Sequence, residues 1–91
     1  MLHMGHAHGV YIQAAINTAR KHDNIVLETS GVSMHSKIKE AVERVGEGRV
    51  AFGSDYPFHD YSVELQKIRV AGLTERQKEL VLYANAKELL L

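Results

Sequence analysis

The sequence predicts an α/β fold with a parallel sheet, from its strand composition and from the order of its segments. Two short apolar runs, 25–29 and 49–53, are rich in Ile, Val and Phe, as buried parallel strands are. Longer helical segments separate and follow them. Strands that alternate with helices of ten or more residues indicate βαβ units. The predicted helices span 10–22, 33–45, 61–70 and 74–91.

The first third of the chain is predicted from apolar spacing and from helix-end signals. Residues 2–4 are interpreted as the end of a strand, and 5–9 as a loop. Apolar residues then recur at helical spacing over 10–22. The basic residues 20–22 lie in the last turn, where positive charge is stabilised by the negative end of the helix dipole. Asp-Asn at 23–24 ends the helix.

The remaining helices carry clearer signals. The helix 33–45 has one apolar face, and Gly46 ends it. Thr74 and Gln77 form a predicted capping box, in which each side chain accepts a backbone N–H of the first turn. Asn85 is predicted to cap the last helical turns. The apolar face of the helix 33–45 is formed by Ile38, Ala41, Val42 and Val45.

Composition excludes several classes of function. The 91 residues hold 11 Lys plus Arg and 11 Asp plus Glu, so the net charge is zero and the sequence disfavours nucleic-acid binding. There is no cysteine, which excludes disulfides and fits a cytoplasmic protein. No apolar run approaches 18 residues, so no membrane span is expected.

Asp55 is the strongest candidate for chemistry. It directly follows the strand 49–53, and ligands of parallel α/β folds bind at the carboxyl ends of strands. A carboxylate there could bind a metal or accept a proton from metal-bound water, or could simply cap a turn. His3, at the possible strand end 2–4, could be a metal ligand or an electrostatic stabiliser, or could have no fixed role near the terminus.

Five further residues are weaker candidates. His6 and His8 have the His-x-His spacing of metal ligands but lie among glycines, where they could bind zinc or nickel adventitiously. Glu28, near the end of an apolar strand, should face either the site or solvent, because burial without a partner is costly. Tyr56 and His59 follow Asp55 in the chain and could contact substrate or be exposed loop residues.

Four segments, in order, resemble the C-terminal part of amidohydrolase-related metal-dependent hydrolases. His3-Met4-Gly5 is similar to the end of the family's sixth barrel strand, and 24–31 to the seventh strand. The segment 49–58, with Gly-Ser-Asp-Tyr-Pro, resembles the eighth strand with its terminal Asp. The segment 72–90 resembles the closing helices. The resemblance covers nearly the whole chain.

This resemblance implies a partial (β/α)8 TIM barrel, in which 1–91 forms one segment with the last two to three β/α units and the closing helices. It implies hydrolysis of an amide, ester or lactone-like bond in a small molecule by water activated on a divalent metal, zinc above all. A related metal-dependent decarboxylase is the alternative reaction. Asp55 and His3 would be catalytic and metal-binding residues, ahead of His6 and His8. Glu28, Tyr56 and His59 would bind substrate.

A complete barrel needs about 250 residues, so the chain is interpreted as an incomplete portion that is inactive as a monomer. An incomplete barrel should leave sheet edges unpaired, so the apolar strands around Val26 and Val50 should need cover. We expect self-association, or association with the remainder of a barrel. Two alternatives are a non-catalytic α/β association module and a metal-binding accessory piece that uses His3, His6 and His8.

Overall fold

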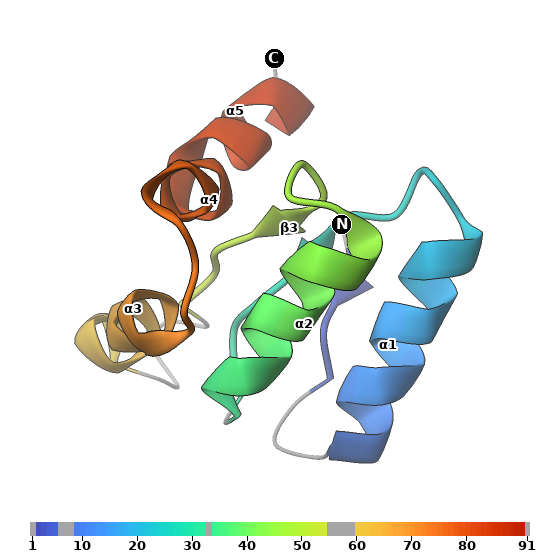
Figure 1. The fold of residues 1–91 in the computed structure, drawn as a ribbon, viewed down its shortest axis with the longest axis horizontal. Helices are drawn as coiled ribbons and strands as arrows, with labels where there is room; N and C mark the ends of the chain where they lie inside the picture. Colours follow the sequence, from blue (N-terminus) through green and yellow to red (C-terminus); the bar gives the residue numbers. More distant parts are fainter. Residues whose placement is uncertain (1, 6–8, 33, 55–59, 91) are drawn as a thin grey trace.

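The computed structural model describes residues 2–5, 9–32, 34–54 and 60–90. Three short parallel strands form one sheet in chain order, and helices follow each of them (Figure 1), which confirms the predicted α/β class. The strands are β1 (Leu2–His3), β2 (Leu27–Glu28) and β3 (Val50–Ala51). The helices are α1 (Gly9–Lys21), α2 (His35–Val45), α3 (Tyr61–Val70), α4 (Glu75–Glu79), the π-helical η1 (Leu80–Ala84) and α5 (Asn85–Leu90).

The strand register divides the sheet into two rows that point to opposite faces. In one row, Leu2, Leu27 and Val50 lie abreast; in the other, His3, Glu28 and Ala51 do. Leu27 and Val50 are completely buried in the hydrophobic core, whereas Glu28 is half-buried and His3 is exposed. The register therefore separates a packing face from a face that carries the polar candidates.

Helices α1 and α2 lie side by side over the packing face (Figure 1). Each contributes a stripe of residues that recur every three or four positions, because one side of each helix faces the sheet. Burying each large aliphatic side chain of this kind contributes roughly 1.5–3 kcal/mol. The fully buried helical members are Ile12, Ile16, Ala19, Ile38 and Ala41.

The strands are shorter than the apolar runs that predict them. The predicted strands 25–29 and 49–53 contain only β2 and β3, two residues each. Hydrogen bonds of the sheet nevertheless continue beyond those bounds. Leu2 N donates to Val26 O at 2.6 Å, and Thr29 N donates to Ala51 O at 3.0 Å. The regular ladder is thus two residues long on each strand, with single hydrogen bonds on either side of it.

The C-terminal helices differ from the prediction at Asn85. The capping box at Thr74 and Gln77 is present as predicted. Asn85, however, continues the helix with φ −66° and ψ −42°, so the prediction that it caps the last turns is wrong. Its side-chain amide instead donates to Glu47 O at 2.6 Å and to Val50 O at 2.9 Å. A tertiary contact therefore uses the group that the local prediction assigned to a cap.

The same helices cover the outer edge of β3. Phe52 N donates to Val81 O in η1 at 2.8 Å, and the Asn85 amide binds Val50 O. Both Phe52 N and Val50 O point away from β2, because the intervening Ala51 O accepts from β2. The chain itself therefore covers both strands that were expected to need cover: the strand around Val26 lies between β1 and β3, and the C-terminal helices cover the outer edge around Val50.

Arg49 joins the elements at the amino end of the sheet. Its guanidinium donates to Ile25 O at 3.0 Å and to Val45 O at 3.4 Å, at the end of α2. It also donates to Ala19 O at 2.6 Å and to His22 O, at the end of α1. The last carbonyls of a helix have no partner within the helix, and a cation suits the negative end of its dipole. One side chain thus binds carbonyls at the ends of two helices beside β2.

We expect Arg49→Met to destabilise the fold by about 2–4 kcal/mol, because several partly buried carbonyls lose a charged donor at once. Arg49→Lys should be intermediate, because one ammonium cannot reach the same set of acceptors. The measurement is urea unfolding followed by circular dichroism. Arg44→Met is the control, since Arg44 is half exposed and makes only a 3.9 Å ion pair with Glu40. Equal losses for Arg49 and Arg44 would contradict this role.

Candidate functional site

His3 and Glu28 are the two predicted site residues that lie in the described part of the chain. The register places them abreast on adjacent strands, on the face opposite the core. Gly53 and Ser54 continue from β3 at the same carboxyl end of the sheet. The other predicted site residues, Asp55, Tyr56, His59, His6 and His8, lie outside the described residues.

The backbone after β1 sets the hydrogen bonding of His3. Gly5 N donates to His3 Nδ1 at 3.2 Å. Gly5 has φ +89°, and a side chain there would come within 2.7 Å of the Tyr11 backbone, so glycine allows this turn. Because Nδ1 accepts, the neutral ring carries its proton on Nε2. His3 is therefore arranged to donate from Nε2, and metal coordination through Nε2 would require the Gly5 contact to be replaced.

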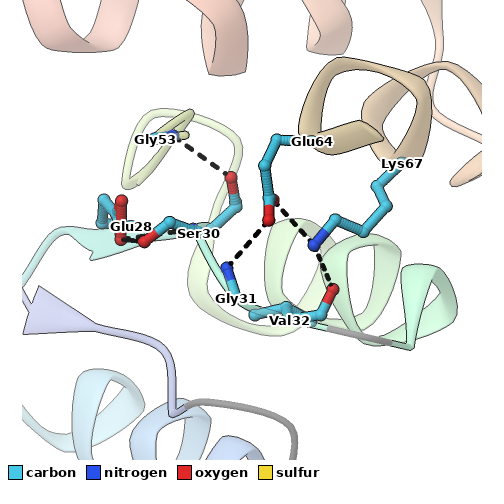
Figure 2. A network of polar contacts seen from close by, with 8 residues as sticks. Glu28, Ser30, Gly31, Val32, Gly53, Glu64 and Lys67 are labelled. Atoms are coloured by element: carbon cyan, nitrogen blue, oxygen red, sulfur yellow. Dashed lines mark hydrogen bonds and ion pairs between the residues drawn. The ribbon is translucent and has the colours of Figure 1, made fainter. Parts of the chain in front are cut away.

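Glu28 is held in place from two sides. Ser30 donates to Glu28 Oε2 with its backbone N at 3.2 Å and with its Oγ at 2.7 Å. On the other side the carboxylate lies directly against Gly53, where any Cβ would overlap it. Figure 2 shows Glu28 bound to Ser30, with Gly53 on the neighbouring segment. A glycine at the end of β3 thus makes room for a carboxylate from β2, next to the segment that contains Asp55.

Both ends of the segment that contains Asp55 are anchored. At its start, Gly53 N donates to the buried Thr29 Oγ1 at 3.4 Å. The rings of Phe52 and Tyr61 meet edge to face, with centroids 5.9 Å apart. At its end, Asp60 caps α3 by accepting from Ser62 N at 2.8 Å and Ser62 Oγ at 2.7 Å. The Ser62 hydroxyl and then the Ser62 amide lower the pKa of the Asp60 carboxyl below its ordinary value of 3.8.

Sequence reasoning missed a buried ion pair beside this site. Glu64 is 3% exposed, and its Oε2 lies 2.7 Å from Lys67 Nζ. Glu64 Oε1 accepts from Gly31 N at 3.3 Å, and Lys67 Nζ donates to Val32 O at 2.7 Å (Figure 2). A signal exists in the sequence: Glu64 precedes the buried Ile68 by four positions and so shares its helix face. A charge on a buried face requires a partner.

The described residues do not by themselves form a metal site. No group of three or more His, Asp or Glu side chains gathers in that part of the chain. The surface hollow lined by Val26, Gly48 and Asn85 lies at the amino end of the strands, away from His3 and Glu28. The candidate site lies instead at the carboxyl ends of the strands, where polar side chains of adjacent strands converge. No helix of the described part is long and apolar enough to cross a membrane.

Many parallel α/β enzymes carry polar residues at the carboxyl ends of their strands, so the architecture by itself does not identify a family. The family model for amidohydrolases matches residues 1–91, so the chain belongs to the amidohydrolase family. Among solved structures it is similar to 5-carboxyvanillate decarboxylase from Sphingomonas paucimobilis, with 29% identity and a TM-score of 0.70. That match covers 82% of this chain and 22% of the decarboxylase.

Two further structures have the same fold at lower identity. A dihydroxybenzoic acid decarboxylase from Polaromonas sp. JS666, with bound manganese and the inhibitor 2-nitroresorcinol, is 21% identical, with a TM-score of 0.70 and coverage of 82% and 22%. The 2,6-dihydroxybenzoate decarboxylase from Rhizobium is 20% identical, with a TM-score of 0.70 and coverage of 81% and 22%. No curated protein matches the chain significantly. The chain thus spans about a fifth of these structures, as a portion of a TIM barrel.

Gly53→Ala should destabilise the fold by about 1–3 kcal/mol, because the new methyl group overlaps the Glu28 carboxylate. The same substitution should cost much less in a Glu28→Ala background, where the space is open. Urea unfolding of the four proteins of this double-mutant cycle measures the coupling. Gly48→Ala is the matched control, since a Cβ there meets no atom within 4 Å. Equal costs of Gly53→Ala in both backgrounds would disprove the contact.

Asp60 should contribute to the acid sensitivity of the fold. Its folded-state pKa is depressed, so its contribution is complete above the unfolded value of 3.8 and is lost as pH falls through the lower folded value. Asp60→Asn retains a good N-cap but does not titrate. The difference in thermal midpoint between the wild type and this variant should therefore shrink between about pH 6 and about pH 2.5. A difference that does not change with pH would argue against a titrating cap.

Proposed function

We propose that the chain supplies three consecutive β/α units of a metal-dependent decarboxylase that acts on a hydroxylated aromatic acid. The observation that carries the reaction type is the match to 5-carboxyvanillate decarboxylase, at 29% identity over 82% of the chain. It favours decarboxylation over the hydrolysis that the family resemblance first implies. The activity belongs to a complete barrel, and the proposed partner is the remainder of that barrel.

The proposed roles follow from the convergence of the strand ends. The His3 Nε2–H is a donor suited to a substrate carboxylate or carbonyl oxygen. Glu28 keeps Oε2 on Ser30 and presents a carboxylate beside Gly53, where it can accept from a ring hydroxyl. Tyr56 and His59 are proposed to contact the same substrate. Placing a donor and an acceptor on neighbouring strands would orient an aromatic acid.

Asp55 is the proposed metal-binding residue, because the His3 Nε2–H that is proposed to bind substrate cannot also coordinate a metal. His6 and His8 form the alternative, adventitious site. Hard divalent ions such as manganese and magnesium prefer oxygen ligands, and zinc accepts both oxygen and nitrogen. Manganese is bound in the decarboxylase from Polaromonas. A bound divalent ion would supply positive charge that holds substrate oxygens and stabilises negative charge.

Metal binding by the untagged chain tests this assignment. We expect Mn²⁺ titrated calorimetrically to bind the wild type, and Asp55→Asn to weaken binding by at least about tenfold through loss of a charged ligand. His6→Ala/His8→Ala should leave the Mn²⁺ affinity unchanged. Loss of binding only in the histidine variant would assign the metal to an adventitious or accessory site instead. The same titration with Zn²⁺ compares the two metals.

Substrate class is tested on the Mn²⁺-loaded chain with two small acids. We expect 2,6-dihydroxybenzoate to shift the NMR signals of Glu28 and Ser30 and benzoate to shift them less, because benzoate lacks the ring hydroxyls. Glu28→Gln should reduce the difference between the two acids. Equal shifts from both acids would contradict recognition of a ring hydroxyl.

A further inference from the structure

The buried pair Glu64–Lys67 contacts the loop that follows β2, far from α3 in sequence. Glu64 Oε1 accepts from Gly31 N, and Lys67 Nζ donates to Val32 O, across separations of 33 and 35 residues. Gly31 has φ +74°, a left-handed conformation that glycine adopts readily. The pair therefore binds one donor and one acceptor of the backbone at a tight turn (Figure 2).

The buried Glu64–Lys67 ion pair is not an efficient way to stabilise the fold. Removing two charges from water costs free energy that their mutual attraction often does not exceed, and apolar residues of similar size frequently replace a buried pair without loss. Glu64 is 3% exposed and Lys67 is 15% exposed, so both are desolvated. What an apolar replacement cannot reproduce is the pair of bonds to Gly31 N and Val32 O.

The anchored loop is the same loop that holds the candidate site. Ser30, which precedes Gly31, donates twice to Glu28 Oε2. Thr29, one residue earlier, accepts from Gly53 N at the start of the segment that contains Asp55. The residues 29–32 thus connect Glu28, the start of that segment, and α3, which begins where that segment ends.

We infer that Glu64 and Lys67 are positioning residues, which set the placement of Glu28 and of both ends of the Asp55 segment through the loop 29–32. They touch neither Glu28 nor Gly53 in the contacts described above. They act by holding the turn from which Ser30 and Thr29 donate and accept. This role rests on the proposed function only in its consequence for metal binding; the mechanical coupling stands on the geometry alone.

The decisive variant is Glu64→Leu/Lys67→Met, which replaces both members of the pair by apolar side chains. Each single variant leaves one buried charge and can unfold the chain, so the double variant carries the test. We expect its thermal midpoint to stay close to that of the wild type. Hydrogen exchange of the Ser30 and Gly53 amides should nevertheless accelerate at least about tenfold, because local opening of the loop becomes easier.

The matched control is Glu75→Leu/Lys78→Met, an ion pair of the same i,i+3 spacing in α4 whose Glu75 side chain is 92% exposed. It should leave exchange at Ser30 and Gly53 unchanged. Unaltered exchange of these two amides in a folded Glu64→Leu/Lys67→Met chain would overturn the inference. The inference would also be overturned if the thermal midpoint fell while amide exchange rose equally across the whole chain. That result would show that the pair only stabilises the fold.

A second readout uses Mn²⁺ alone. In the double variant at a temperature where it is fully folded, we expect the Kd for Mn²⁺ to rise about fivefold, because Gly53, two residues before Asp55, is held less firmly by the loop 29–32. An unchanged Kd would overturn the extension to metal binding. If the wild type itself binds no Mn²⁺, the proposed metal function fails for this chain, and the exchange measurements still decide whether Glu64 and Lys67 position the loop.

Discussion

The guanidinium of Arg49 binds carbonyl groups from α1, α2 and the segment before β2, and the sheet depends on this convergence. Two parallel helices that end at the same level leave several carbonyls without partners in a partly buried place. A planar cation with five N–H groups can satisfy them together. With the helix ends held there, their apolar stripes face Leu27 and Val50, and the three strands keep a single register.

The two ends of the sheet are built from different interactions. At the amino end, Arg49 and Asn85 donate to backbone carbonyls and so complete the hydrogen bonding of helices and strand. At the carboxyl end, Glu28 and Glu64 accept from backbone and hydroxyl donors, and Lys67 balances the charge of Glu64. This asymmetry matches parallel α/β enzymes, in which the amino end serves stability and the carboxyl end serves chemistry.

The outer edge of β3 is covered by the C-terminal helices of the same chain. Val81 and Asn85 satisfy backbone groups that a neighbouring strand would otherwise bind. The π-helical stretch η1 belongs to this contact, and such stretches commonly occur where a helix adapts to a specific local requirement. The chain therefore closes one side of its short sheet with its own C-terminal helices.

Much of the fold followed from local patterns, because they reflect period, composition and capping chemistry. The alternation of apolar runs with amphipathic helices predicted the parallel α/β class, and Thr74 with Gln77 predicted a capping box that is present. Asp55 was singled out from its position after a strand, and Glu28 from a charge within an apolar run. These inferences need only neighbours in sequence.

The remaining features depend on contacts between distant residues. The apolar runs could not reveal that only two residues of each would pair, or that Asn85 would bind β3 instead of capping a helix. Gly53 has a clear purpose only when the carboxylate of Glu28 lies against it. Glu64 and Lys67 bind the backbone of Gly31 and Val32 only because α3 packs beside them.

By itself, the sequence determined the fold class and the candidate residues. Tertiary structure decided their partners, because burial and hydrogen bonding join groups more than 20 residues apart in the chain.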